Sequence, residues 1–266
     1  MKLHSFLIPA ALLASTLAMN AAEKPGYTDT PVITGQKWRV HDAERPQPRT
    51  VTPGAAFSHG APAPSDAKVL FDGTDLSLWT KGGAPAPWKV ENGYMEVVGK
   101  SGSIETKDHF GSFQLHLEFA APNPPVGDGQ ARANSGIFLH GIYEIQVLDG
   151  YRNPTYADGS VGSIYGQWPP LALAAKPPGQ WQSVDILFEA PRTDQGRVRE
   201  PAHVTVILNG IVVQHRQPIL GPVRHREVAA YDANTPTRGP IGLQDHGDPV
   251  RFRNIWIRPL GEHDQP

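Results

Sequence analysis

From Lys68 onward, short runs of alternating hydrophobic and polar residues are separated by turn-forming residues. In FQLHLEF, residues 113–119, every second side chain is a large hydrophobe, which is the pattern of a strand with one buried face. The dipeptides Asn92-Gly93 and Asn209-Gly210 each join two such runs, and Asn-Gly is favoured in two-residue hairpin turns. The pattern therefore predicts an all-β sandwich or barrel over roughly Lys68–Leu260.

Two segments depart from this simple alternation. In RFRNIWIR, residues 251–258, neither face is wholly apolar, so we expect this strand to serve both the core and a ligand-lined surface. The helical candidate Leu171–Lys176 lies between two Pro-Pro pairs and is too short for more than a turn or two. It belongs to the long segment Asp149–Gln180, whose aromatic residues favour a functional loop over disorder.

Residues 143–151, YEIQVLDGY, carry polar side chains in the middle of a predicted strand. Tyr143, Ile145 and Val147 alternate with Glu144 and Gln146, and successive side chains of a strand point to opposite faces. Glu144 and Gln146 therefore share one face, which meets either water or a bound ligand.

The N-terminal residues have a different composition. Residues 1–22 combine an early basic residue, an apolar run and two small residues, which predicts a secretory signal peptide cleaved near Ala21–Glu23. The cleavage motif is imperfect, so a retained N-terminal anchor is the alternative. Residues 23–64 are rich in Pro, Gly and Thr and predict an extended arm, which leaves residues 65–266 as the folded domain.

Composition narrows the classes of ligand. The chain has no cysteine, which excludes disulfides, thiolate metal sites and a cysteine nucleophile. Its 24 Lys and Arg residues are balanced by 26 Asp and Glu residues, which argues against nucleic acid and against electrostatic attachment to a membrane surface. We therefore expect an exported domain, periplasmic or extracellular, that spans no membrane after processing and binds a small neutral ligand. The oligomeric state stays open.

Several ordered motifs resemble the 3-keto-disaccharide hydrolase domain family. They are LFDGTDLSLW (70–79), NSGIFLHGIYEIQVLD (134–149), GSIYG (162–166), VTVILNG (204–210) and GPIGLQDHGDPVRFRNIWI (239–257). The arm segments GYTDTP and KWRVHD also look like those of many exported members. The resemblance implies a concanavalin A-like jelly-roll β-sandwich of two antiparallel sheets, similar to laminarinases and legume-type lectins. It also implies a small carbohydrate substrate, a glycoside already oxidised to a ketone at carbon 3.

The candidate chemistry follows from that substrate. Such glucanases carry Glu-x-Asp-x-Glu on one strand, whereas this chain has Glu144, Gln146 and Leu148, and retaining hydrolysis needs two carboxylates about 5–5.5 Å apart. In a 3-keto sugar the hydrogen on carbon 2 is acidic, so a base can remove it, an enolate forms, the anomeric group leaves and water adds. We assign Glu144 as the base, Gln146 as a donor to a sugar oxygen, and His246 as the acid or enolate donor.

Each assignment has a structural alternative. Glu144 could pair with a surface Arg, Gln146 could bond across strands, and His246 could stabilise the turn DHGD. Gln244 shares a face with His246 and is a predicted substrate-binding residue, whereas Asp245 points the other way and is expected to be structural.

Other polar and aromatic residues near these motifs are weaker candidates. The further predicted substrate-binding residues are Arg132, Asn134, His140, Asp149, Tyr165 and Trp168. The polar ones could clamp hydroxyl groups, although turn-capping and hairpin-end roles fit them as well. The two aromatic ones could stack on a sugar ring or fill the interior of the loop.

We assign no cofactor, although a divalent metal such as calcium has two candidate positions. Asp72 and Asp75 in FDGTD lack the full EF-hand spacing and favour a turn. His140, Asp149 and His246 could converge on an ion that polarises the ketone, but their spacing forms no recognisable motif.

Two other classes of function are compatible with the sequence. One is a noncatalytic, lectin-like carbohydrate-binding module, because a fold does not determine a function. The other is an accessory domain of a surface complex, for which the arm would be a tether. A pocket that buries one sugar above Glu144 would favour the enzyme, and an open groove lined by aromatic residues would favour the lectin.

Overall fold

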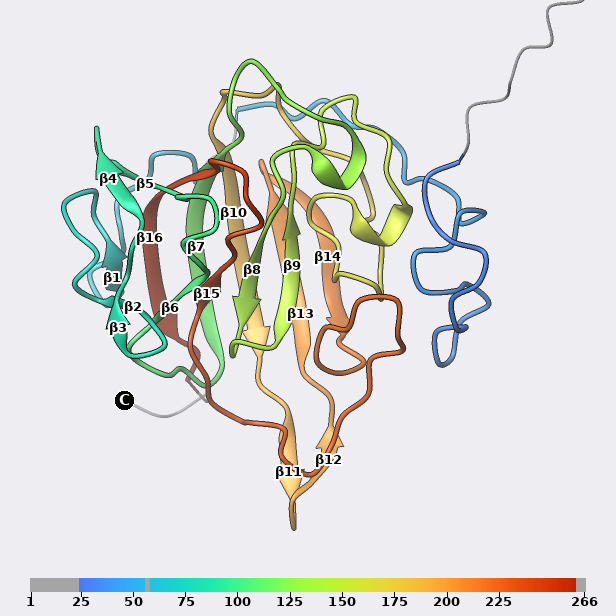
Figure 1. Ribbon diagram of the computed structural model, residues 1–266. Helices are drawn as coiled ribbons and strands as arrows, with labels where there is room; N and C mark the ends of the chain where they lie inside the picture. Colours follow the sequence, from blue (N-terminus) through green and yellow to red (C-terminus); the bar gives the residue numbers. More distant parts are fainter. Residues whose placement is uncertain (1–23, 56–57, 262–266) are drawn as a thin grey trace, which may run out of the picture.

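The computed structural model describes residues 24–55 and 58–261, which form two antiparallel sheets packed face to face (Figure 1). In spatial order the larger sheet contains β14 (Ile211–Pro218), β13 (His203–Leu208), β10 (Gln182–Glu189), β7 (Phe113–Ala120), β16 (Arg251–Pro259), β5 (Tyr94–Glu96) and β4 (Lys89–Glu91), with β1 (Lys68–Phe71) also paired to β16. The smaller sheet contains β3 (Ala84–Pro85), β2 (Trp79–Lys81), β6 (Ile104–Thr106), β15 (Gly242–Leu243), β8 (Ser135–Leu139) and β9 (Tyr143–Val147). A separate ribbon contains β11 (Arg192–Asp194) and β12 (Arg197–Glu200).

The predicted all-β sandwich is confirmed. Within the described residues the helical elements are two short 3₁₀ turns, η1 (Gly129–Ala131) and η2 (Ala157–Gly159). The helical candidate Leu171–Lys176 is not helical, and Leu173 instead forms a parallel bridge with Thr50 of the arm. No helix in the part of the chain that the structure describes is long and apolar enough to span a membrane.

Both Asn-Gly dipeptides form the predicted hairpin turns. Asn92 and Gly93 join β4 to β5 with φ values of 49° and 79°, and Asn209 and Gly210 join β13 to β14 with φ values of 53° and 81°. Two consecutive residues in the left-handed region are what a type I′ turn requires. The dipeptide thus supplies a backbone shape that most residue pairs would adopt only with strain.

A bulge explains the mixed pattern of β16. Its register with β7 shifts between Arg253 and Trp256, and Asn254 has a φ of 48°. Because an extra residue reverses which face the next side chain takes, Phe252 and Ile255 both lie in the core. The run therefore changes face part-way along the strand.

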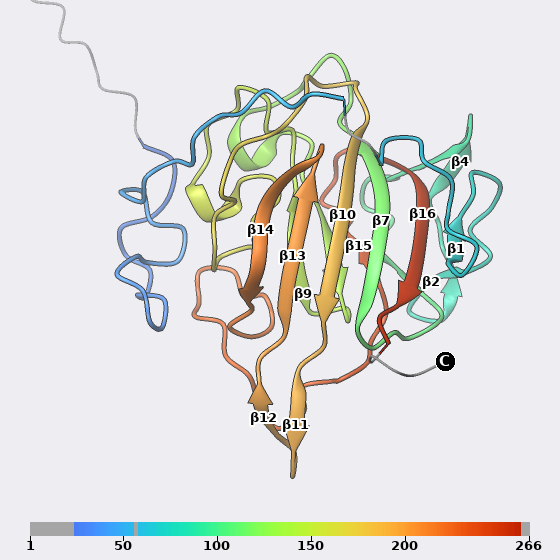
Figure 2. The same cartoon turned by 180° about the vertical axis from the view of Figure 1, so that it is seen from behind.

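The arm covers the polar face of β7, which the alternating pattern of that strand would predict to be exposed to solvent. Figure 2 shows it crossing one end of the larger sheet before it reaches β1. The Ser58 hydroxyl donates to the Asp185 carboxylate at 2.5 Å, and the Gly60 amide donates to the Glu118 carboxylate at 2.5 Å. As a result His116 and Glu118, on the polar face of β7, are both fully buried. The predicted signal peptide, residues 1–22, lies outside the described residues.

Candidate active site

Glu144 lies on the outer face of the smaller sheet. Its strand neighbour Ile145 is in the core, so Glu144 points away from the larger sheet. Residues opposite one another in an antiparallel pair share a face, and the register pairs Glu144 with Phe138 of β8 and Phe138 with Gly242 of β15. Gly242 in turn pairs with Glu105 of β6, which completes a row across four strands.

A second row on the same face contains the two predicted glutamines. Gln146 pairs with Gly136, and the main-chain amide of Gln244 donates to the Gly136 carbonyl at 3.0 Å. The two glycines leave the centre of this face without side chains. A Cβ at Gly136 would collide with the Glu144 carboxyl group, and one at Gly242 would lie 3.1 Å from the Phe138 Cβ. A cavity of about 280 Å³ opens over the adjoining part of this face, lined by residues that include Phe138, Gly242 and Gln244, and Glu144 is not among its lining residues.

The carboxyl group of Glu144 has an unusual environment. The residue is only 6% exposed, yet none of the described residues donates a hydrogen bond to its side chain. Burial disfavours the charged form and raises the pKa of Glu144 to about 8. Such a carboxyl group can give or take a proton near neutral pH, which is the property required of a general acid or base.

Tyr165 is held beside Glu144 by main-chain pairing. Residues 162–165 extend the smaller sheet at β9 through an antiparallel bridge between Ile145 and Ile164. The Tyr165 amide donates to the Glu144 carbonyl at 3.1 Å, so the two residues face each other and their side chains share the outer face. Burial raises the pKa of Tyr165, and the nearby Glu144 raises it further. Its hydroxyl group therefore stays protonated and can donate a hydrogen bond.

A histidine from another loop, His225, approaches the hydroxyl group of Tyr165. The Tyr165 hydroxyl lies 2.6 Å from the Tyr156 hydroxyl and 3.3 Å from Nδ1 of His225. Burial lowers the pKa of His225, and His41, Arg226 and His246 lower it further.

The predicted residue His246 is exposed, and its effect on the pKa of His225 indicates that the two imidazoles lie in the same region. His225 was not among the residues predicted from the sequence.

The glutamines offer hydrogen-bond acceptors to a ligand. The side-chain amide of Gln146 donates to Oδ1 of Asn134 at 3.0 Å. The side-chain amide of Asn134 donates in turn to the main-chain carbonyl of Gln130 at 2.8 Å. The Oε1 atoms of Gln146 and Gln244 are buried and have no hydrogen-bond partner among the described residues. A buried acceptor without a donor costs free energy, and a sugar hydroxyl group could satisfy it.

Other predicted site residues have structural roles instead. Nε of Arg132 lies 3.0 Å from Oδ2 of Asp149, and Arg132 also donates to the Tyr151 carbonyl, which braces the loop. His140 is not at a solvent-exposed hairpin end: its ring packs 4.7 Å from that of Phe188, and its Nε2 lies 2.9 Å from the Gly111 carbonyl oxygen. The structure brings none of these side chains into contact with Glu144.

Two further residues of the predicted set are also accounted for. The indole of Trp168 donates to the Pro218 carbonyl at 2.9 Å and packs against the core, so it offers no platform for a sugar. Asp245 is structural as predicted, because it accepts hydrogen bonds from the amides of Gly102 and Gly247.

The two candidate metal positions do not assemble a site. Asp72 and Asp75 accept hydrogen bonds from the turn residues Thr74 and Ser77. No group of three or more His, Cys, Asp or Glu side chains suited to a metal ion occurs within residues 24–55 and 58–261.

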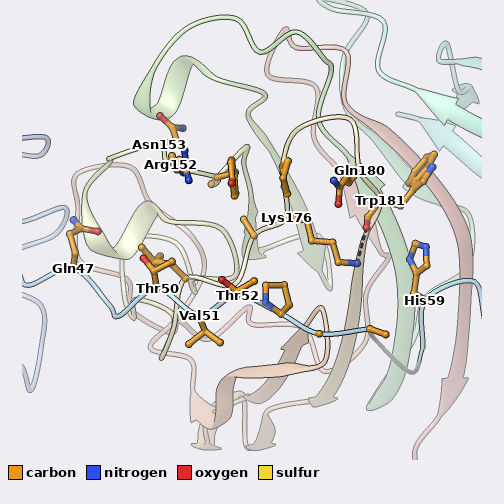
Figure 3. Close-up of a pocket in the computed structure, with 18 of the residues that line it drawn as sticks. Gln47, Thr50, Val51, Thr52, His59, Arg152, Asn153, Lys176, Gln180 and Trp181 are labelled. Atoms are coloured by element: carbon orange, nitrogen blue, oxygen red, sulfur yellow. Dashed lines mark hydrogen bonds between the residues drawn. The ribbon is translucent and has the colours of Figure 1, made fainter.

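A larger cavity lies elsewhere in the molecule (Figure 3). It has a volume of about 1120 Å³ and opens between the arm and the loops 150–154 and 173–181. Its charged lining residues are the cationic Arg152 and Lys176, with His59 beside them, and none of the predicted site residues lines it. We therefore place the candidate active site on the outer face of the smaller sheet around Glu144, where an acid–base group is present.

Comparisons with known proteins agree with this architecture. The sequence profile of the 3-keto-alpha-glucoside-1,2-lyase-like domain matches residues 66–258. The chain belongs to this family. A relative from Bacteroides thetaiotaomicron named 3-keto-disaccharide hydrolase is 28% identical over 250 residues, which cover 75% of this chain and 80% of the relative.

Solved structures of related proteins share the fold. A crystal structure from Parabacteroides distasonis, with the provisional description of glycosyl hydrolase, is 47% identical, covers 81% of this chain and 93% of that one, and has a TM-score of 0.70. A second one from the same organism, with the same description, is 28% identical, covers 73% of this chain and 99% of that one, and has a TM-score of 0.55. These related structures share the two-sheet fold, and the family match begins at residue 66, after the arm.

Proposed function

We propose that this protein cleaves 3-keto-glycosides by elimination and hydration, with Glu144 as the base. The observation that carries the proposal is the buried, unpaired carboxyl group of Glu144 with a pKa near 8, in a family whose description and whose Bacteroides relative both name 3-keto sugars. A protein that only binds sugars has no need of such a group.

The proposed reaction uses the acidity that the ketone confers. The Glu144 carboxylate takes the proton from carbon 2, and the electron pair of that bond forms an enolate at the oxygen on carbon 3. The enolate then expels the anomeric substituent with its electron pair, which leaves a double bond between carbons 1 and 2. Addition of water at carbon 1, with return of a proton to carbon 2, gives the free 3-keto sugar.

The neighbours of Glu144 can stabilise the enolate and can protonate the departing group. The protonated hydroxyl of Tyr165 can donate to the enolate oxygen, and such donors are worth about 10²–10³ in rate where they have been removed. We assign to His246, which is exposed in the same region as His225, the role of protonating the departing group. Gln146 and Gln244 can accept hydrogen bonds from sugar hydroxyl groups through their unpaired Oε1 atoms.

The geometry gives less support to a double displacement. On the outer face, the other carboxylate in the row of Glu144 is Glu105, three strand spacings away. At about 4.8 Å per spacing, their main chains are about 14 Å apart. A glycosyl-enzyme mechanism needs carboxyl groups about 5–5.5 Å apart. The elimination route needs only one.

A direct test compares a synthetic 3-keto disaccharide with its unoxidised parent. We expect release of a 3-keto monosaccharide from the first and no cleavage of the second. In deuterated water the product should carry deuterium at carbon 2, since the elimination breaks that carbon–hydrogen bond. Cleavage of the parent at a comparable rate, or a product without deuterium, would overturn the proposal. Tight binding of the ketone without turnover would favour the lectin-like alternative.

Export of the protein is a separate part of the proposal. It rests on residues 1–22, and intact-mass analysis of protein from the native host tests it. A chain that begins at Met1 in the cytoplasmic fraction would contradict it.

A further inference from the structure

The arm, residues 23–64, precedes the matched family region, yet it contributes a buried histidine next to the candidate active site. His41 is fully buried, and its Nδ1 lies 3.2 Å from the Oδ1 of Asp158. The main-chain amide of His41 donates to the other carboxylate oxygen of Asp158 at 2.9 Å. Asp158 belongs to η2, in the segment that also carries Tyr156 and Tyr165. One carboxylate therefore fixes both the backbone and the ring of His41.

The backbone of His41 is held in an uncommon conformation. Its φ is 55°, in the left-handed region that residues other than glycine seldom adopt. Such a conformation costs on the order of 1–3 kcal/mol and persists where the surroundings enforce it. The Nε2 atom of His41 is also buried without a hydrogen-bond partner among the described residues. A residue needed only to attach the arm would require neither feature.

The ring of His41 packs against the side chains that surround the site. Its centroid lies 4.2 Å from that of Tyr156, 4.7 Å from that of Tyr165 and 5.5 Å from that of His225. Tyr165 and His225 are themselves joined at 3.3 Å. Removal of the imidazole would thus leave a void directly behind the pair that we place beside Glu144.

The arm also holds the loop that carries His225. The guanidinium of Arg226 donates to both carboxylate oxygens of Asp29, at 2.8 and 2.9 Å, and lies 4.1 Å from the centre of the Tyr27 ring. Tyr27 in turn packs edge-on against His225 at 6.2 Å. The loop bearing His225 is therefore attached to the arm at the adjacent residue.

We propose that the N-terminal arm is part of the catalytic unit, with His41, held by Asp158, positioning the Tyr165 hydroxyl and the His225 imidazole beside Glu144. This inference rests on the proposed function. His41 is a positioning residue, because its ring packs against Tyr165 and His225 and would act on the reaction only through them. The family's matched region alone would lack this support.

The main test is the variant His41→Phe, which keeps an aromatic ring but loses the contact with Asp158. We expect kcat on a 3-keto disaccharide to fall by at least about tenfold, with KM changed by less than about threefold, since misplacement of catalytic groups acts mainly on the chemical step. The matched control is His59→Phe, the same change at an exposed arm position on the other side of the molecule, where we expect wild-type turnover.

A second readout does not depend on activity. The groups facing His225 are His41 and Tyr27 of the arm, Arg226 of its own loop, His246 and Tyr165. Burial and the charges of His41, Arg226 and His246 lower its pKa, so His41→Phe should raise the pKa of His225 measured by NMR titration. His59→Phe should leave it unchanged. A merely structural effect on the arm would not move this value selectively.

The outcomes separate the two proposals. If His41→Phe turns over within about twofold of the wild type and the His225 titration is unchanged, the arm has no role in the site. If the wild type cleaves no 3-keto glycoside, the proposed function fails, and the NMR titration still decides whether His41 positions His225. Should His41→Phe fail to fold, Asp29→Ala removes the exposed ion pair that attaches the His225 loop to the arm and should lower kcat. An unchanged kcat in that variant would overturn the inference.

Discussion

The amide of Tyr165 donates to the carbonyl of Glu144 at 3.1 Å, so the two side chains leave the sheet side by side on its outer face. This pairing joins a strand of the sheet to a loop nearly twenty residues later in the sequence. It fixes the distance between a candidate base and a candidate hydrogen-bond donor through main-chain atoms, which are the least adjustable part of the protein. The relative placement of base and donor is therefore built into the fold.

Glu144→Gln should abolish most turnover on a 3-keto disaccharide while leaving the fold and substrate binding largely intact. The change is nearly isosteric and removes only the ionisable group, and general acid–base assistance is worth about 10²–10⁴ in rate. Glu189→Gln is the matched control, because Glu189 is a strand carboxylate paired with Arg216 on the larger sheet. Turnover of Glu144→Gln within about threefold of the wild type would make Glu144 structural and point to His225 or His246 as the base.

The pH dependence should report the titration of Glu144. Its pKa in the free protein is raised to about 8, so the carboxylate needed to remove a proton is a minority species at pH 7. We expect kcat/KM to rise with pH and to level off above about pH 8. A profile that instead falls through this range would assign Glu144 as the acid.

Glu144→Gln should also change how stability depends on pH. The folded-state pKa of about 8 lies above the ordinary value of 4.5, so the folded protein holds this proton more tightly than the unfolded chain. The associated stability is fully present below about pH 4.5 and is lost as pH rises through 8. Relative to the wild type, the variant should gain on the order of 3 kcal/mol in unfolding free energy between pH 5 and pH 9. Urea denaturation at both pH values measures this, and an equal difference at the two would contradict the buried, unpaired state.

Tyr165→Phe should lower kcat by about 10–10³-fold because it removes a donor to the developing enolate. The fold should survive, since the main-chain bond to Glu144 is retained. Tyr94→Phe, which removes a hydroxyl bonded to Glu91 on the larger sheet, should have wild-type kinetics. A loss confined to KM would make Tyr165 a binding residue.

Ser58→Ala should destabilise the protein without affecting turnover. The Ser58 hydroxyl donates to the buried Asp185 carboxylate, and loss of a hydrogen bond to a charged group costs about 1.5–3 kcal/mol. Ser65→Ala, at an exposed position directly after the arm, should be neutral. Equal unfolding midpoints in urea for the two variants would show that the contact contributes little.

The parts of this structure that the sequence predicted are those set by local patterns. Alternation placed Glu144 and Gln146 on one face of a strand, because side-chain direction has a period of two wherever the backbone stays extended. The Asn-Gly turns were predictable for a similar reason. The bulge of β16 was not predicted, because the mixed pattern that it leaves also fits a regular strand with one face toward a ligand.

The rest of the candidate site depends on contacts between distant segments. His41 and Asp158 are 117 residues apart, and no spacing or propensity connects them. His225 comes from a third segment without periodicity. His140 shows the converse error, because a histidine before a glycine in a hairpin looks exposed, yet this turn is covered by aromatic residues of the core.

The glycines at 136 and 242 have a consequence for how related enzymes could diverge. They leave bare peptide backbone under the candidate sugar site, so the depth of the floor is independent of any side chain. A methyl group at Gly242 would raise that floor next to Phe138 without altering Glu144, Tyr165 or the histidines. Substitutions there would be expected to alter which ring substituents fit before they alter the chemistry, so selectivity and reactivity could evolve at separate positions of one sheet.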